Sequence, residues 1–279
     1  MAEHPGATRF AMVGDGGTAD GKQRGIASSL LRQYKTTPFS DLLLLGDNVY
    51  IDGAPEKFES ALGRPFRPLL ARGVRLLPIL GNHDVGTQRG SAQLTYLGLG
   101  KKRWYRTTLA KGRVDLFALD TTVFVDDEWS YRDARSQDWR MAQAEKQIAW
   151  MNEEFGKSTA PYKIVMGHHP LYSSGTRAFE RYQMRSVFGD VLHDNHIDAY
   201  LAGHQHIYER REPIDGVVHF VSGGGGRDPF LLGGRGRLPR VHRLENHTVM
   251  FEDRGEALGF EAVTADGTII DRGELRQRR

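Results

Sequence analysis

The sequence predicts an α/β protein in which two sheets form a β-sandwich and helices cover both outer faces, a four-layer α/β/β/α arrangement. Two observations lead to this fold class. Along residues 8–221, short apolar runs alternate with segments of helical period, which is the pattern of strands joined by crossover helices. Beyond them, strand-like runs follow one another closely with turn residues between, which indicates antiparallel strands.

The strand candidates in the alternating part are short and apolar, and most are rich in β-branched residues, as expected for strands buried on both faces. They lie at residues 8–13, 41–45, 74–80, 114–119, 162–166, 199–202 and 217–221.

Between these runs, apolar residues recur with the period of an α-helix, which predicts helices at residues 23–34, 56–72, 139–155 and 181–193. In the third segment, apolar residues recur at spacings of three and four. This spacing predicts one buried stripe, formed by Met141, Ala144, Ile148 and Met151.

The C-terminal part contains three closely spaced strand candidates, at residues 248–252, 259–264 and 268–273. Turn residues such as Asp266 and Gly267 separate them, which predicts an antiparallel meander. No linker or internal repeat divides the chain, so we expect a single domain over residues 7–275.

The composition excludes several classes of protein. The chain has no cysteine, so a bound metal must be held by oxygen and imidazole. Lysine and arginine (38) exceed aspartate and glutamate (35) by only three, so no nucleic-acid partner is expected. The longest conspicuous apolar run, residues 42–45, is far too short to span a membrane. The first residues do not resemble a signal peptide, so we expect a cytoplasmic protein, or a secreted or periplasmic one if the N-terminus was trimmed.

Five polar clusters lie where strand candidates end, each beside a glycine. They are Gly14-Asp15-Gly16, Gly46-Asp47-Asn48-Val49-Tyr50, Gly81-Asn82-His83-Asp84, Gly167-His168-His169 and Gly203-His204-Gln205-His206. Because parallel strands place their carboxyl ends at one edge of a sheet, these side chains can converge on one ligand. Carboxylates, an amide and imidazoles together predict a metal site.

Each cluster taken singly has a simpler interpretation. An aspartate between glycines, such as Asp15, suits a tight turn. His204 and His206 fit a surface strand as well as a pair of ligands directed to one side. The repetition of such residues at equivalent strand ends favours the metal site.

In this order the clusters resemble the motifs of the calcineurin-like metallophosphoesterase superfamily, which are an Asp in the first cluster, Gly-Asp, Gly-Asn-His, Gly-His and Gly-His-x-His. The resemblance covers residues 10–226. Tyr50, three residues after Asp47, makes the chain similar to purple acid phosphatases of the tartrate-resistant type. The resemblance implies the four-layer fold and a metal-dependent, acid phosphatase-like hydrolase of phosphoric esters.

The resemblance also implies a centre of two metal ions. The first ion would be held by Asp15, Tyr50 and His206. The second would be held by Asn82, His168 and His204, and Asp47 would bridge the two. Because a phenol loses its proton only to a strongly Lewis-acidic ion, Tyr50 favours Fe(III) at the first position, with a divalent Fe, Zn or Mn at the second. The alternative is that Tyr50 packs as an aromatic without reaching the metal.

The implied reaction is hydrolysis of a phosphorylated small molecule or phosphoprotein by a metal-generated hydroxide, without a protein nucleophile. We expect His83 to protonate the leaving group with Asp84 as its carboxylate partner, or else to support the metal ligands from outside. His169 is a secondary catalytic candidate if its turn directs it into the pocket. Where small members of the family carry a further histidine this chain has Arg177, which we expect to contact phosphate instead.

Two segments are expected at the rim of the site. The glycine run 223–226 lacks the ending of a P-loop, which predicts a flexible rim loop. Residues 85–113 predict another part of the rim, in which Trp104 and Tyr105 either stack on a leaving group or pack as an edge strand.

The motifs leave two other functions open. The same metals hydrolyse diesters, so a phosphodiesterase acting on cyclic nucleotides or other diesters is the main alternative. The second alternative is a non-catalytic interaction protein with this fold. Such a protein is expected to lack metal ligands, whereas all of the ligand positions are filled here. The sequence predicts no particular oligomeric state.

Overall fold

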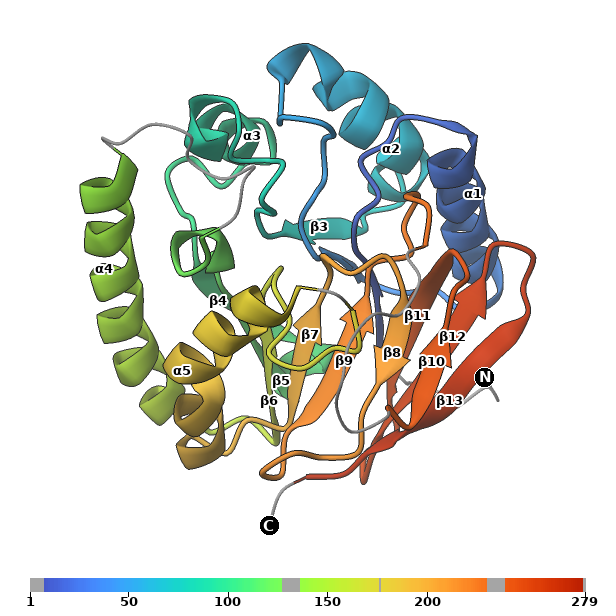
Figure 1. The fold of residues 1–279 in the computed structure, drawn as a ribbon. Helices are drawn as coiled ribbons and strands as arrows, with labels where there is room; N and C mark the ends of the chain where they lie inside the picture. The colour runs from blue at the N-terminus through green and yellow to red at the C-terminus, as the bar shows by residue number, and fades with distance from the viewer. Residues whose placement is uncertain (1–7, 127–135, 176, 230–238, 278–279) are drawn as a thin grey trace.

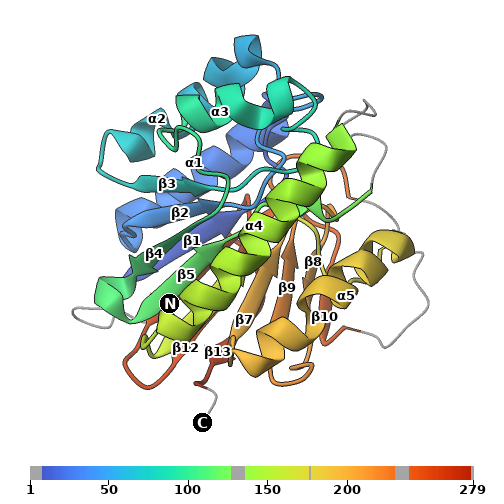
Figure 2. The same ribbon diagram turned by 90° about the vertical axis from the view of Figure 1, so that its left-hand side faces the viewer.

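The computed structural model describes residues 8–126, 136–175, 177–229 and 239–277. Two sheets lie face to face, and helices cover both outer faces (Figures 1 and 2). The predicted four-layer α/β/β/α arrangement is confirmed. Within the described residues, none of the helices combines the length and apolar character needed to cross a membrane.

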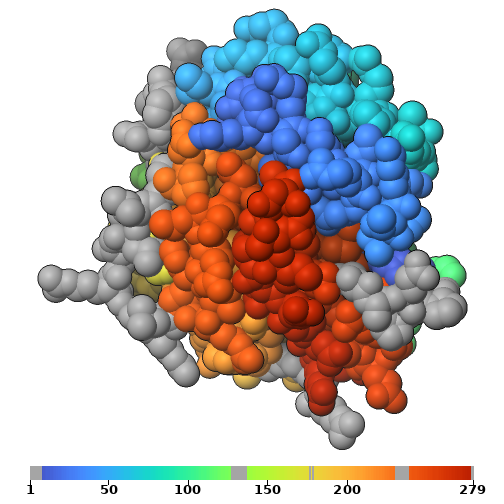
Figure 3. Space-filling view, turned by 90° about the vertical axis from the view of Figure 1, so that its right-hand side faces the viewer, coloured from blue at the N-terminus to red at the C-terminus, as the bar shows by residue number. Residues whose placement is uncertain are grey.

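The first sheet has the strand order β13-β12-β11-β1-β2-β3. Its parallel part consists of β1 (Arg9–Val13), β2 (Asp41–Leu44) and β3 (Arg75–Pro78). The predicted C-terminal meander forms its other half, with β11 (His247–Asp253), β12 (Leu258–Thr264) and β13 (Ile269–Leu275). Because β11 pairs antiparallel with β1, the two ends of the chain share one sheet, and β12 and β13 lie beside α1 on the face in Figure 3.

The second sheet has the strand order β10-β8-β9-β7-β6-β5-β4. Four of its strands run parallel: β5 (Val114–Ala118), β6 (Tyr162–Met166), β7 (Ala199–Ala202) and β9 (Val218–Ser222). Three short strands run antiparallel at its margins: β4 (Tyr105–Leu109), β8 (Tyr208–Arg210) and β10 (Val241–Arg243). Strand β4 is the edge strand predicted as one alternative at Trp104 and Tyr105, whereas sequence patterning missed β8 and β10. Both sheets are therefore mixed.

Helices α1 (Gly21–Thr36) and α2 (Arg64–Leu70) cover the first sheet, and α4 (Ser136–Lys157) and α5 (Ala178–Asp194) cover the second (Figure 2). A short helix, α3 (Ser91–Tyr96), lies between β3 and β4. Single 3₁₀ turns occur at η3 (Gln88–Gly90), η4 (Ala110–Gly112) and η5 (Thr121–Val123).

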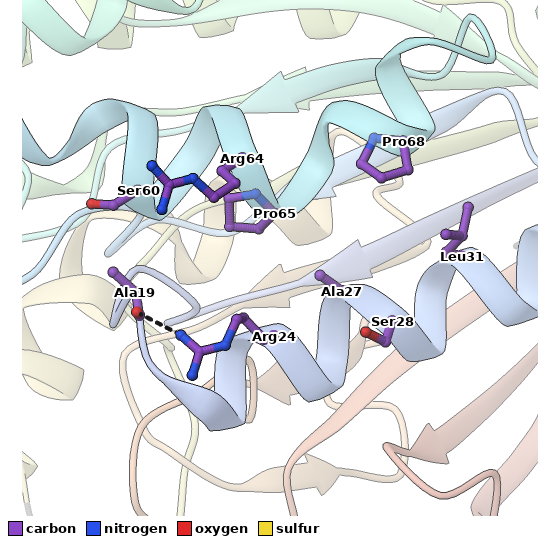
Figure 4. A pocket seen from close by; sticks show the side chains of 9 residues that line it. All are labelled: Ala19, Arg24, Ala27, Ser28, Leu31, Ser60, Arg64, Pro65 and Pro68. Carbon is purple, nitrogen blue, oxygen red and sulfur yellow. Dashed lines mark hydrogen bonds between the residues drawn. The ribbon is translucent and has the colours of Figure 1, made fainter.

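The helix predicted at 56–72 is interrupted. It forms a 3₁₀ turn, η1 (Pro55–Lys57), a π turn, η2 (Glu59–Gly63), and then α2. Prolines at 65 and 68 lack the amide hydrogen that a regular helix uses, so the segment does not continue as one α-helix. Beside it, a hollow of about 240 Å³ separates α1 from α2, with Arg24 and Arg64 on its two sides (Figure 4).

The main core lies between the two sheets. In β1, Phe10 and Met12 face this core, while Ala11 and Val13 face the helices on the other side. This double burial explains why the parallel strands appear in the sequence as continuous apolar runs rather than as an alternation. A third apolar cluster joins the second sheet to α4 and α5.

The predicted apolar stripe of α4 is wrong in part. Met141 and Ile148 are exposed, at 57% and 37%, while Met151 is buried. The helix instead buries Gln147, whose side-chain amide bonds to both the backbone nitrogen and the carbonyl oxygen of Asp120. These two hydrogen bonds satisfy backbone groups at the end of β5, and Met151 and Phe155 pack inward together with Gln147.

Candidate metal centre

The five polar clusters all follow parallel strands at their carboxyl ends. Three follow β1, β2 and β3 of the first sheet, and two follow β6 and β7 of the second. Because the two sheets face each other, the turns from both lie at one end of the sandwich (Figure 1). The structure therefore brings together all seven predicted metal ligands: Asp15, Asp47, Tyr50, Asn82, His168, His204 and His206.

The backbone at this edge is held in an uncommon conformation. Asp15, Asp47 and His204 have φ values of 58°, 52° and 68°, in the left-handed region that non-glycine residues rarely adopt. The neighbouring glycines allow the turns to approach one another, since a Cβ atom on Gly81 would overlap the carboxylate of Asp47. Strain of this kind, of order 1–3 kcal/mol per residue, is characteristic of functional sites.

Asn82, His168 and His204 form the first group of converging side chains. Oδ1 of Asn82 lies 3.0 Å from Nε2 of His168 and 3.1 Å from Nδ1 of His204, and the two imidazole nitrogens are 3.2 Å apart. All three residues are buried. Burial lowers the pKa of His168, and it lowers that of His204 further, where the charges of His169 and His168 add to the effect.

The other nitrogen of each of these rings has an acceptor outside the centre. Nδ1 of His168 donates to the carbonyl oxygen of Leu45 at 2.8 Å, and Nε2 of His204 donates to the carboxylate of Glu180 at 2.6 Å. Each ring therefore presents an unprotonated nitrogen to Asn82, which is the form that binds a metal.

Asp15, Tyr50 and His206 form the second group. The hydroxyl of Tyr50 lies 3.3 Å from Oδ1 of Asp15 and 3.3 Å from Nε2 of His206. Nδ1 of His206 donates to the carbonyl oxygen of Asp228 at 3.1 Å, so its Nε2 also faces inward unprotonated. Burial and the charges of Asp47 and Asp15 raise the pKa of Tyr50 well above its ordinary value.

Asp47 lies between the two groups. Its Oδ1 is 3.4 Å from Nε2 of His168, and the donor atoms of Asp15, Asp47 and His168 all fall within 4.8 Å of one another. Burial alone would raise the pKa of Asp47, but the neighbouring His168, His83 and His204 lower it. The carboxylate is therefore ionised and touches both groups, as a bridging ligand must.

The donor set fits metal ions for an electrostatic reason. In the first group, Asn82, Asp47 and the two imidazoles turn lone pairs, not hydrogens, toward one another at 3.0–3.4 Å. Buried lone pairs at such distances repel unless a cation lies among them. Two buried sets of side chains satisfy the spacing of a metal site: His168 with His169 and His204, and Asp15 with Asp47 and His168. Oxygen and imidazole donors suit a transition-metal ion.

His83 and Asp84 differ from the predicted pairing. The carboxylate of Asp84 is buried and accepts hydrogen bonds from the backbone nitrogens of Asn48, Val49 and Gly81, at 2.8–3.1 Å. Nδ1 of His83 donates to the carbonyl oxygen of Ile51. Asp84 therefore holds the turn that carries Asp47, and its expected part in orienting His83 is taken by a backbone carbonyl.

The second ring nitrogen of His83 lies beside the centre. Its Nε2 lies 3.9 Å from Oδ2 of Asp47, at the edge of the centre, and its ring packs 4.7 Å from that of Tyr50. The backbone nitrogen of His83 also donates to Oδ1 of Asp47 at 3.0 Å. The same residue thus fixes the carboxylate and presents a ring nitrogen beside it.

His169 is buried beside the first group. Its ring lies 4.5 Å from the ring of His204, and its Nδ1 is 2.8 Å from Oγ1 of Thr121. A hydrogen bond from Tyr200 to its backbone carbonyl, at 2.9 Å, further fixes it. His169 therefore packs against a predicted ligand, in a position to support that ligand.

The glycine run at residues 223–226 is not the flexible rim loop that the sequence suggested. All four glycines are buried, and Gly225 donates a backbone hydrogen bond to Gly14 at 2.8 Å. A Cβ atom on Gly223 would lie 2.8 Å from the carboxylate of Asp15. The run consists of glycines because it packs directly against the cluster Gly14-Asp15-Gly16, where a side chain would not fit.

Three further residues at the site escaped sequence reasoning. Glu180 contacts His204, the Asp228 carbonyl contacts His206, and the guanidinium of Arg227 lies 4.6 Å above the ring of Tyr50. Arg177, the predicted phosphate contact, bonds Glu180 at 3.0 Å. Glu180 lies in a helix with no motif around it, so no sequence signal could have found it.

A fold with two facing sheets and a buried His/Asp/Asn centre at one edge defines a metallophosphoesterase. The family model for calcineurin-like phosphoesterases matches residues 8–208, and the chain belongs to this family. The predicted resemblance is thus confirmed.

Distant relatives place the chain near the purple acid phosphatases. It is 26% identical over 247 residues to purple acid phosphatase 17 of Arabidopsis thaliana, covering 81% of this chain and 70% of that protein. It is 26% identical over 243 residues to human tartrate-resistant acid phosphatase type 5, covering 78% of this chain and 73% of that protein.

Two solved structures share the fold. GAP50, described as the anchor in the inner membrane complex of Plasmodium, superposes with a TM-score of 0.77 at 18% identity, covering 98% of this chain and 90% of that one. The purple acid phosphatase PPD1 of yellow lupin superposes with a TM-score of 0.76 at 19% identity, covering 98% of this chain and 55% of that one. At these identities the likeness concerns the fold alone.

Proposed function

We propose that this protein is a binuclear-metal phosphomonoesterase of the purple acid phosphatase type. The observation that carries the proposal is the position of Tyr50, whose hydroxyl lies 3.3 Å from both Asp15 and His206 inside the centre. The phenol oxygen thus lies within reach of two predicted ligands of the first ion, where it could join them as a third ligand. The metal-dependent phosphoesterase class follows from the family, and the acid phosphatase activity rests on this residue and on the distant relatives.

One ion would be held by Asp15, Tyr50 and His206. The other ion would be held by Asn82, His168 and His204, and Asp47 would bind both ions. We propose Fe(III) beside Tyr50, because burial and two nearby carboxylates hold its proton tightly and only a strongly Lewis-acidic ion displaces it. A divalent Fe, Zn or Mn suits the neutral oxygen and nitrogen donors of the second group. When bound, the two ions would activate water for attack on phosphorus and neutralise the phosphate oxygens.

The chain itself supplies proton transfer and orientation. His83, with Nδ1 fixed on the Ile51 carbonyl, presents Nε2 at the edge of the centre and would protonate the leaving alkoxide. The exposed Arg227, above the Tyr50 ring, is placed to contact a phosphate oxygen, and Arg177 lies on the other side of His204. His169 keeps the His204 ring in place.

Metal analysis combined with a visible spectrum tests this proposal. We expect close to two transition ions per chain, one of them iron, and an absorption band from tyrosinate bound to Fe(III). Two divalent ions without this band would contradict the ferric assignment while leaving hydrolysis intact. Less than one transition ion per chain in the folded protein of native sequence would instead support a non-catalytic interaction protein.

A phosphodiesterase remains the second candidate, because the same ion pair hydrolyses diesters and the rim decides which substrate fits. The exposed Arg227 favours the monoester, since a phosphate monoester carries one more negative charge than a diester for a guanidinium to neutralise. Rates on an aryl phosphate and on the corresponding bis-aryl phosphate separate the two. A preference for the diester would overturn the monoesterase proposal.

A further inference from the structure

Helix α4 lies over the outer face of the second sheet (Figure 2), and a second hollow is lined by residues of α4, of β4 and of the loop before β4. It has a volume of about 510 Å³, and it shares no residue with the metal centre. Its walls carry cations and indole rings, from Lys101, Lys102, Arg103, Trp104, Arg106 and Trp150. We call it the Trp–Lys hollow.

The two arginines of the Trp–Lys hollow are already paired and give it a fixed shape. Arg103, 8% exposed, donates to Asp120 at 2.6 Å and to the carbonyl oxygen of Arg89 at 2.6 Å. Arg106 bonds Asp115 at 2.6 Å and Glu154 at 3.3 Å. These contacts anchor the wall of the hollow to the buried ends of β5. A ligand that binds there would therefore not bear the entropic cost of ordering these arginine side chains.

The positive charges of the two lysines, by contrast, are not neutralised by a neighbouring carboxylate within the part of the chain that the structure describes. Lys101 and Lys102 are exposed, and among the described residues the side-chain ammonium group of neither has an ion pair or hydrogen bond. The carboxylate in the lining, Glu154, is occupied by Arg106 and Lys157. The hollow therefore presents two adjacent positive charges without a counter-charge, which favours an anionic ligand.

Trp104 and Trp150 supply the other half of the recognition chemistry. Both rings are half-buried; one lies in the loop before β4, and the other projects from α4, fixed edge-on against Phe117 at 6.5 Å. A half-buried indole offers a rigid flat surface on which a planar ring can stack. Neither residue is used by the metal centre.

We propose that the Trp–Lys hollow binds a mononucleotide, or an anion with the same combination of planar ring and phosphate. The ring would stack on an indole, and the phosphate would lie against Lys101 and Lys102. The volume is within the range of about 300–1,000 Å³ that small-molecule sites occupy. The proposal stands apart from the function of the metal centre and needs no hydrolysis.

Calorimetric titration of the metal-loaded protein with a non-hydrolysable nucleotide tests the proposal. The probe is the phosphonate analogue of AMP in which CH₂ replaces the bridging ester oxygen, so that no P–O ester bond can be cleaved. We expect one mole per chain to bind at the Trp–Lys hollow, in addition to any phosphonate that binds at the metal centre. Adenosine, which lacks the charge, and methylphosphonate, which lacks the ring, should each bind more weakly by about fivefold or more.

Variants locate the binding. We expect Trp104→Leu to raise Kd about 5- to 150-fold and Trp104→Phe to raise it less, because phenylalanine keeps a flat ring. Lys101→Ala with Lys102→Ala should raise Kd about fivefold or more. The matched control removes the same two charges from the other hollow, by Arg24→Ala with Arg64→Ala, and should leave Kd unchanged (Figure 4).

The metal centre is the competing location for a phosphonate. Asp47→Asn, checked for folding by circular dichroism, should weaken metal binding and leave nucleotide binding in place. If Asp47→Asn abolished binding while the lysine pair had no effect, the nucleotide would occupy the metal centre and the proposal would be wrong. Equal Kd values for adenosine and the phosphonate would overturn it as well, because the lysines would then have no part.

Discussion

Glu180 accepts a hydrogen bond from Nε2 of His204 at 2.6 Å, and Arg177 holds the same carboxylate at 3.0 Å from the other side. This arrangement directs Nδ1 of His204 toward Asn82 and His168. A carboxylate behind a ligating imidazole fixes the ring and its tautomer and increases its basicity. Helix α5 thus acts on the centre without contributing a ligand.

Glu180→Gln should therefore lower metal affinity by about tenfold or more, because it removes the charge behind His204. Competition with a chromogenic chelator measures the affinity directly. The exposed Glu153 of α4 offers a matched control, since Glu153→Gln removes the same charge at a distance from the centre. Equal metal retention in the two variants would show that Glu180 has no such role.

Asp47→Asn should release at least one ion and reduce hydrolysis by about a thousandfold or more, since a bridging carboxylate stabilises both ions and the loss amounts to several kcal/mol. Metal content per chain and kcat on an aryl phosphate are the measurements. Retention of both ions with near-native kcat would exclude Asp47 as the bridge.

Tyr50→Phe removes only the hydroxyl at 3.3 Å from Asp15 and His206. We expect the visible absorption band to disappear, because the tyrosinate is its source, while divalent ions still support some hydrolysis. The measurement is the visible absorption spectrum of the iron-loaded variant, compared with that of the iron-loaded native protein. A band that survived the substitution would have to come from another group, and Tyr50 would not be a ligand.

His83→Gln should slow the hydrolysis of alkyl phosphates far more than that of aryl phosphates with good leaving groups. An alkoxide needs a proton to depart, and a general acid contributes about 10²–10⁴-fold. Metal content should stay at the native level, because the predicted ligands are untouched. Equal losses on both kinds of ester would instead indicate a supporting role beside Asp47.

The buried histidines outside the centre predict acid sensitivity. Burial and the charge of Arg211 lower the pKa of His219 to about 3, and burial lowers that of His247 to about 4. Each ring is neutral in the folded state but takes up a proton in the unfolded state below pH ~6.5. Their contribution to stability is therefore complete above that pH and is lost as the pH falls toward 4 and 3.

For His219 the loss amounts to about 2–3 kcal/mol between pH 7.5 and pH 4.5. His219→Phe keeps a ring between Tyr172 and Tyr200 but cannot be protonated. Urea unfolding at the two pH values should show a smaller difference for this variant by about that amount. An unchanged difference would show that His219 is already charged in the folded protein.

Much of this structure could be predicted from local sequence patterns. The parallel strands are buried on both faces and therefore stand out as apolar runs, and β6 and β7 begin and end where the sequence predicts. Strands β8 and β10 were not predicted, because they are only 3 residues long and include charged side chains, such as Arg210 in β8, that pair with acids elsewhere. Local composition does not reveal such partners.

The inward face of α4 shows the same limit. Apolar period favoured Met141 and Ile148, yet the helix buries Gln147, because its amide satisfies the backbone of Asp120. Asp120 lies 27 residues before Gln147, so the apolar period of the helix does not reveal this contact.

The identities of the predicted ligands and their positions at strand ends can be read from the sequence, because a glycine beside a polar residue after an apolar run is a local pattern. The second hydrogen-bond partner of each predicted ligand, by contrast, becomes known from the packing of the fold. Leu45, Glu180 and Asp228 each accept a hydrogen bond from a ligand histidine, and Asp84 holds the turn of Asp47. These contacts join elements far apart in the chain, so they depend on how the two sheets pack.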